Sequence, residues 1–312
     1  MPCYIEQMLP RLSFLLLVLL IVGIGGTVGL VSFVSTVERA PVSLARLRMF
    51  ARRHQLTVTV NNGDRVIRYL ATTRRWRVIG LVGGLLTSVG WALSQGAVRV
   101  DFLTLFAGWF VGALIAEIRL ARTSFGPRRA ASLTARVPVM YLPRFAWWLV
   151  PVMAAISVAV CIATAVVALR GAMIGPAAWV LCGASVLIAV VVNGVQRRVL
   201  RRPQPVDAPD VVAADDAIRS RSLHVLTGGG ATLVLYCVLG QLIALAPPVA
   251  GALSPTGAGQ AFEVVTTLGV VLVPIIGWAV ATAQWRVVRL ANAAGPSGPS
   301  GSGGSDGSDG SP

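Results

Sequence analysis

Two adjacent carboxylates, Asp215 and Asp216, are the residues whose types and spacing most suggest chemistry. They form the only adjacent pair of acids in a chain with 27 basic and 12 acidic residues. Such a pair binds a cation or takes part in phosphoryl transfer when a further group converges on it. Arg219 follows Asp215 at i,i+4 and Asp216 at i,i+3, in the order that favours ion pairing on a helix.

Three interpretations of this acid pair are open. In the first, the acids pair locally with Arg219, on a helix that extends the following apolar segment. In the second, they pair with arginines of another Arg-rich segment and hold the helices together. The expected partners are then Arg65, Arg68, Arg74 and Arg75. In the third, the pair is a functional site. The first two interpretations make the acids counterions and not catalytic groups.

The other chemistry-bearing residues predict neither a metal site nor a cofactor site. His54 and His224 are the only histidines, lie far apart in the sequence and have no neighbouring pattern of Cys or Glu. Every basic residue is an arginine, and without lysine the chain has no G-x-x-x-x-G-K-[ST] phosphate loop. We therefore expect no catalytic residue, no metal and no cofactor.

The elements that must position these residues are membrane-spanning helices. The chain is 55% hydrophobic and 12% charged, whereas a soluble domain has about 25% charged residues. Seven apolar segments approach the length that a helix needs to cross a bilayer. They cover residues 12–34, 78–97, 102–118, 145–169, 173–195, 223–246 and 264–284. The expected fold is an all-α polytopic bundle of about seven spans, of which the third is the least certain.

The arginines predict an orientation for this bundle. Of the 27, 24 lie in residues 35–77, 118–144, 196–221 and the stretch after 285. Seven spans place these four segments on one side, which the positive-inside rule assigns to the cytoplasm. The amino terminus is then outside and the carboxyl terminus inside, in a multi-pass protein of the bacterial plasma membrane.

The predicted organisation follows from these spans. The expected units are the N-terminal region with the first helix (1–34), an Arg-rich segment (35–77), a hairpin (78–118), an Arg-rich loop (119–144), a hairpin (145–195), a loop (196–222), a hairpin (223–284) and a disordered Gly/Ser-rich tail (285–312). The first three spans each contain a GxxxG motif, which lets helix backbones approach closely in lipid. The motifs are Gly25 and Gly29, Gly80 and Gly84, and Gly108 and Gly112.

The first Arg-rich segment has structure of its own. "SLARLRMFARRH" (43–54) places Leu44, Leu47 and Phe50 near helical spacing among four arginines, which predicts a basic amphipathic helix on the membrane surface. "LTVTV" (56–60) is typical of an extended piece. Asn61 or Asn62 is then expected to cap a helix that continues unbroken to about residue 93.

Four stretches together resemble one family. They are "RYLATTRRWRVIG" (68–80), "GPRRAASLTAR" (126–136), "YLPR" (141–144) and "AADDAIRSRSLHVLTG" (213–228). They resemble a group of uncharacterised multi-pass membrane proteins from high-GC actinobacteria. The resemblance implies a multi-pass topology and assigns no activity, cofactor or site residue.

The function expected from these patterns is that of a non-enzymatic membrane scaffold or regulatory partner. Its Arg-rich inner face would meet anionic lipid headgroups or an acidic protein. Nucleic acid is not expected as a partner, because the charge falls between apolar segments and not over a soluble face. The alternative is a permease for a small or apolar solute, and a membrane enzyme comes third. A continuous polar cavity would favour the permease, a tightly packed bundle the scaffold, and clustered acids around an opening the enzyme.

Overall fold

The computed structural model describes residues 42–96, 101–122, 137–202 and 208–252, together with Thr36 and scattered positions between 268 and 279. These residues form helices and no strand. The helices are α2 (Leu44–His54), α3 (Val60–Ser94), α4 (Phe102–Arg122), η1 (Pro138–Met140), α5 (Arg144–Leu169), α6 (Pro176–Leu200) and α7 (Pro209–Ala252). The all-α prediction is therefore confirmed for the described part of the chain.

Five of these helices, α3 to α7, are long and apolar enough to cross a membrane. The segment predicted with least certainty, 102–118, is the helix α4. The first predicted span, with Gly25 and Gly29, and the Gly/Ser-rich tail lie outside the described residues. In the last predicted span, Gly269 lies beside Leu239 and Gly277 beside Thr232, so this stretch runs antiparallel to α7.

The surface of the bundle is apolar, and polar side chains lie inside it. Large apolar residues such as Leu187 and Val190 are exposed on α6. Ser157 of α5, Ser185 of α6 and Gln241 of α7 are instead buried. The hydroxyls of Ser157 and Ser185 share a hydrogen bond of 2.6 Å, and a second bond of 2.6 Å joins Ser157 to Gln241. These bonds connect the three helices. Hydrogen bonds between helices and an apolar exterior are the arrangement expected in lipid.

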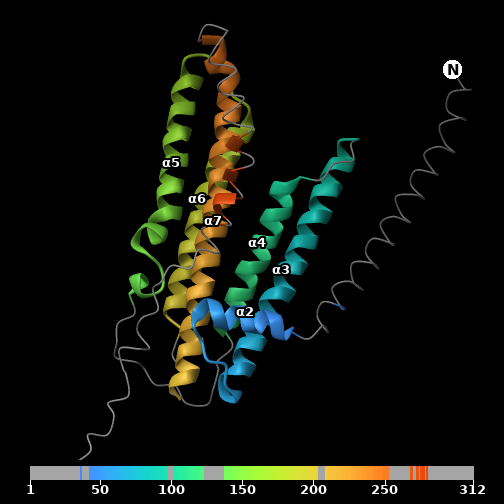
Figure 1. The fold of residues 1–312 in the computed structure, drawn as a ribbon. Coiled ribbons are helices and arrows are strands. Elements are labelled where there is room, and N and C mark those ends of the chain that lie inside the picture. Colours follow the sequence, from blue (N-terminus) through green and yellow to red (C-terminus); the bar gives the residue numbers. More distant parts are fainter. Residues whose placement is uncertain are drawn as a thin grey trace, which may run out of the picture.

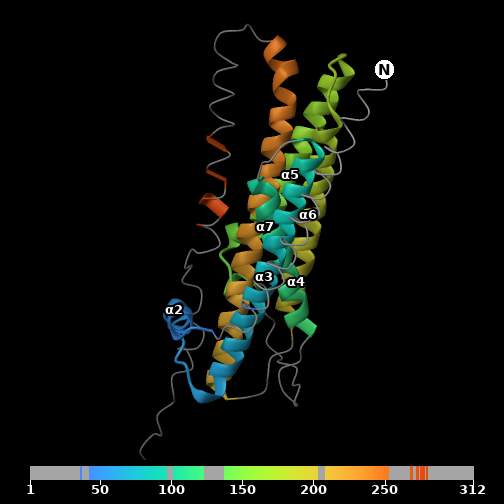
Figure 2. The ribbon, with the colours of Figure 1, turned by 90° about the vertical axis from the view of Figure 1, so that its right-hand side faces the viewer.

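Glycines bring α3 and α4 into close contact. A Cβ atom on Gly80 would overlap backbone atoms of Gly108 and Gly112, and one on Gly84 would overlap the backbone of Thr104. These two helices therefore pack backbone to backbone, as small residues four apart allow. Beside this hairpin, α7 packs against both α5 and α6 (Figures 1 and 2).

The described parts of residues 35–77, 119–144 and 196–222 meet at one end of the bundle, where α2 lies across the long helices (Figure 1). Leu47 and Phe50 of α2 are buried in a cluster with Tyr69 of α3 and Ile218 of α7. The predicted amphipathic helix is therefore present, but most of its apolar face contacts protein. Leu44 remains exposed on α2.

The first turn of α3 is fixed by a capping box. Thr59, and not Asn61 or Asn62, is the N-cap, while the Asn62 side chain accepts a hydrogen bond of 2.9 Å from the Thr59 backbone N–H. The Thr59 hydroxyl also donates to Asp210 in the first turn of α7. These contacts hold the starts of α3 and α7 side by side.

Candidate functional site: a basic pocket beside a buried carboxylate

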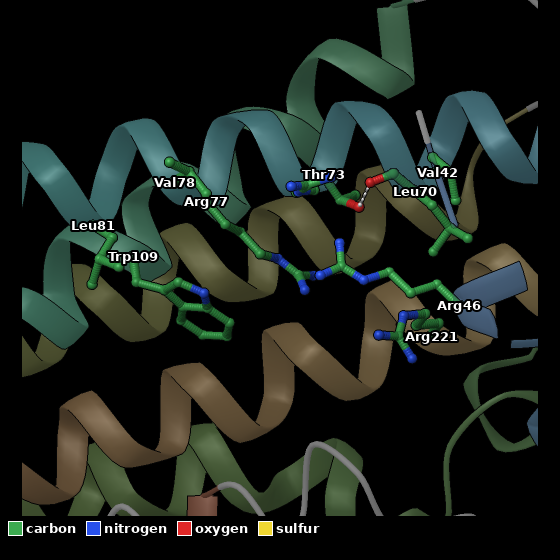
Figure 3. A pocket seen from close by; sticks show the side chains of 10 residues that line it. Val42, Arg46, Leu70, Thr73, Arg77, Val78, Leu81, Trp109 and Arg221 are labelled. Carbon is green, nitrogen blue, oxygen red and sulfur yellow. Dashed lines mark hydrogen bonds between the residues drawn. The ribbon is translucent and has the colours of Figure 1, made fainter. Parts of the chain in front are cut away.

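A pocket of about 330 Å³ lies at the Arg-rich end, between α2, α3, α4 and α7 (Figure 3). Four arginines line it: Arg46 of α2, Arg74 and Arg77 of α3, and Arg221 of α7. Beyond Arg77, toward the charge-free part of α3, the lining becomes apolar. It consists there of Val78, Leu81 and Trp109. The pocket thus has a basic end, where Val42, Leu70 and Thr73 lie beside the arginines, and an apolar end without charge.

Helix geometry explains why these arginines converge. Arg74 and Arg77 are three residues apart and therefore share a face of α3. Arg46 reaches this face because Phe50, one turn further along α2, is anchored against Tyr69 with ring centroids 6.3 Å apart. Figure 3 shows the guanidinium groups of Arg46 and Arg77 pointing toward each other, with Arg221 nearby.

The four guanidinium groups have no acidic partner in the part of the chain that the structure describes, nor a side-chain hydrogen bond there. The Nε atom of Arg77 is buried without an acceptor. Aromatic rings supply some compensation, because Arg77 lies 5.2 Å from the ring centroid of Trp109 and Arg221 lies 5.9 Å from that of Phe50. Because these four positive charges gather around one pocket, it is an anion-binding candidate.

A buried carboxylate, Glu117 of α4, lies behind this pocket. Its side chain is 2% exposed and accepts hydrogen bonds from Arg202 at 3.0 Å, from Ser222 at 2.8 Å and from the Tyr69 hydroxyl at 3.5 Å. These donors come from the end of α6, from α7 and from α3. Glu117 therefore joins four segments through one charge, and it is close enough to Arg77 for the two charges to interact.

His54, the last residue of α2, is held as a neutral imidazole. Burial lowers its pKa to about 4, and the nearby Arg221, His224 and Arg53 act in the same direction. The ring centroid of His54 lies 4.6 Å from that of Phe50. The two histidines, distant in the sequence, are therefore close enough in space to interact. Across the described ranges, no three His, Cys, Asp or Glu side chains are grouped as metal ligands.

The acid pair lies away from the pocket. Asp215 accepts hydrogen bonds from Arg219 at 2.7 and 2.8 Å, and the side chain of Arg219 is fully buried. Arg219 also donates to the Leu200 carbonyl at the end of α6. Asp216 accepts a hydrogen bond of 2.9 Å from the Tyr141 hydroxyl, just after η1. The acids therefore connect α7 to η1 and to the end of α6.

The pairing of the acids with arginines of α3, expected at Arg65, Arg68, Arg74 and Arg75, stays a prediction. On α7, Ala214, Ala217 and Ile218 pack in one cluster with residues of α2 and α3. Arg74 lines the basic pocket.

The sequence interpretation did not identify the residues that form this site. The patterns considered above single out neither Glu117 nor Arg77 nor Arg221, and they place Arg46 only among the arginines of an amphipathic helix. One signal was available. Glu117 is a single acid within an apolar helical segment, and ionisable residues at such positions usually have a specific partner.

Comparison with protein-family models, with curated proteins and with solved structures gives no match for this chain. The resemblance to actinobacterial multi-pass proteins therefore stays a prediction. Any functional interpretation must come from the geometry described above.

Proposed function

We propose that the protein is a multi-pass component of the bacterial plasma membrane that acts as a non-enzymatic scaffold or regulatory partner. Its Arg-rich end faces the cytoplasm and engages anionic groups of lipid or of an acidic protein. Seven spans with the amino terminus outside and the carboxyl terminus inside complete this topology. We also propose that the protein is related to the actinobacterial multi-pass membrane proteins that four of its sequence stretches resemble.

One observation carries the proposal: Arg46, Arg74, Arg77 and Arg221 gather around one pocket without an acidic partner in the described part of the chain. Charges of one sign that crowd around a pocket repel one another, so an anion that binds between them is stabilised. We expect the natural ligand of this end of the bundle to be an anion that fits between these four arginines.

The packing of the spans favours a scaffold over a permease. The GxxxG contact seals α3 against α4, and the buried polar groups of α5, α6 and α7 bond one another. In α7, "TGGGAT" (227–232) packs by its glycines, since Gly229 lies against Phe110 and Gly230 against Val192. Among the described spans, these groups are engaged in contacts between helices.

The buried ion pairs of the Arg-rich end favour a structural role for its carboxylates over an enzymatic one. Glu117 is paired with Arg202, and Asp215 is paired with Arg219. Ion pairs of this kind hold helices together, whereas a general base must lie within hydrogen-bond reach of a substrate. The geometry therefore favours counterions in this region.

Topology and solute flux together test this proposal. Reporter fusions in the Arg-rich segments should read cytoplasmic, and fusions in the two opposite loops should read external. The cytoplasmic positions are Arg75, Arg129, Arg202 and Arg289, and the external positions are Arg99 and Ser254. A cytoplasmic signal near Ser254 would contradict seven spans. Rapid efflux of small solutes from proteoliposomes, absent from protein-free vesicles, would replace the scaffold by the permease.

A further inference from the structure

We infer that the basic pocket binds the phosphate group of an anionic phospholipid, with an acyl chain lying over its apolar end. This inference rests on the proposed function, because it names the anion that the Arg-rich end engages. The phosphate would take the place of the missing counterion between Arg46, Arg77 and Arg221. Arginine suits this role, because its planar fork of N–H donors binds phosphate oxygens in pairs.

The unsatisfied donor of Arg77 points independently to a ligand. Its Nε atom is buried and lacks an acceptor, although buried donors in native proteins nearly always have one. The guanidinium also faces that of Arg46 (Figure 3), an arrangement that is repulsive when nothing lies between the two. A phosphate oxygen at this point would accept from Arg77 and separate the two charges.

The position of the pocket along α3 distinguishes a lipid from a soluble phosphate. Arg77 is the last arginine of α3, and no charged residue follows it until the helix ends at Ser94. Leu81, one turn further on, lies about 6 Å along the axis, and 39% of it is exposed. Together with Val78 and Trp109 it forms an apolar wall directly beyond the arginines. Within one helical turn, the lining thus changes from arginines, which suit a phosphate headgroup, to apolar side chains, which suit an acyl chain.

The size of the pocket also suits a small anionic group better than a protein segment. Its volume of about 330 Å³ is at the lower end of the ~300–1,000 Å³ typical of small-molecule sites. Side chains of α2, α3 and α7 line its basic end. A phosphate diester with the first part of an acyl chain fits such a space, while a folded acidic partner would meet only its rim.

A matched pair of variants tests the inference on the full chain. Arg46→Gln/Arg77→Gln removes two charges from the pocket, one from α2 and one from α3. Arg48→Gln/Arg68→Gln removes two exposed charges from the same two helices outside the pocket. The probes are phosphatidylglycerol and phosphatidylcholine, added to the protein in neutral detergent. Bound lipid is counted by native mass spectrometry, and thermal unfolding is followed in parallel.

We expect the unaltered chain to retain phosphatidylglycerol in preference to phosphatidylcholine. The pocket variant should bind it at least about tenfold more weakly, since it loses charge-assisted hydrogen bonds to the phosphate. The matched control should bind within about twofold of the unaltered chain. Equal losses in both variants would overturn the inference, because they would indicate a general effect of surface charge.

A second variant and two competitors identify the source of the anion. Leu81→Gln keeps all four arginines and changes only the apolar wall, and we expect it to weaken phosphatidylglycerol binding while leaving the unfolding temperature close to that of the unaltered chain. This variant keeps the test valid if the double variant fails to fold. Displacement of the lipid by millimolar inorganic phosphate, or by a polyglutamate peptide, would show that a soluble anion or an acidic protein is the ligand. Because lipid binding is measured in detergent, it can succeed even if the reporter fusions contradict the proposed topology.

Discussion

The Nη2 atom of Arg202 lies 3.0 Å from Oε2 of Glu117, and a second bond of 2.7 Å joins this nitrogen to the Glu117 carbonyl. Arg202 follows the end of α6, and Glu117 belongs to α4, so this pair connects the α3–α4 hairpin to the other helices. Because Tyr69 and Ser222 donate to the same carboxylate, the contact also fixes α3 and α7 behind the basic pocket.

Replacement of the carboxylate should destabilise the bundle strongly. In Glu117→Gln, the side chain that faces Arg202 offers a neutral acceptor in place of a carboxylate. Removing one partner of a buried ion pair lowers the free energy of unfolding by about 3–5 kcal/mol. Arg202 is 11% exposed, so we expect a loss near the lower end of this range. Thermal unfolding in detergent measures it, with Arg201→Gln as an exposed neighbouring control. Equal melting temperatures for both variants would refute a stabilising role for the pair.

The sequence indicated the helices but not this contact. Apolar length and arginine spacing predicted α4 and α6 within a few residues. The pairing of Glu117 with Arg202 depends on how far α6 continues and how α4 is rotated, because both determine which side chains meet. A rotation of α4 by one residue, about 100°, would turn Glu117 away from Arg202. Hydropathy specifies neither the end of α6 nor the rotation of α4, so the sequence did not predict this ion pair.

The glycine contact between α3 and α4 should tolerate no added methyl group. In Gly108→Ala, the new Cβ would overlap Gly84, whose Cα would lie 2.7 Å away, and overpacking of this kind costs about 1–3 kcal/mol. Gly83→Ala is the matched control, because no atom lies within 4 Å of its added Cβ. We expect a lower melting temperature for the first variant and an unchanged or slightly higher one for the second.

Acidification should weaken the attachment of α2. The pKa of His54 is about 4 in the folded protein, against an ordinary value of 6.5. Between these values the unfolded state binds more protons than the folded state, so stability falls as the pH drops from about 6.5 to about 4. Above this window, His54 is neutral in both states and adds no pH dependence.

Unfolding midpoints of the unaltered chain and of His54→Gln, measured between pH 7.5 and about pH 4.5, test this expectation. The midpoint of the unaltered chain should fall more steeply with decreasing pH than that of the variant, because the variant lacks the group that must be charged on release. Parallel curves would show that another group determines the acid sensitivity.

Sequence and structure also differ in what the apolar face of α2 contacts. The spacing of Leu44, Leu47 and Phe50 correctly predicted an amphipathic helix, but a pattern of apolar residues does not specify whether lipid or protein covers them. In the structure, Tyr69 and Ile218 supply that cover for Leu47 and Phe50. This docking places Arg46 in the pocket, which explains why a surface-helix interpretation did not anticipate the site.

The two acids of the adjacent pair should differ sharply when replaced. Asp215 is the ion-pair partner of Arg219, whose side chain is 0% exposed, so Asp215→Asn removes a counterion from a buried guanidinium. We expect a loss of about 3 kcal/mol, because a buried charge without this counterion is costly. Asp216 instead accepts from the Tyr141 hydroxyl, and Asp216→Asn preserves an acceptor oxygen, so its loss should be about 1 kcal/mol or less. Thermal unfolding of the two single variants measures this difference, and lipid binding at the pocket should be similar in both. Two stable variants that had both lost lipid binding would show that the acid pair belongs to a functional site and is not a pair of counterions.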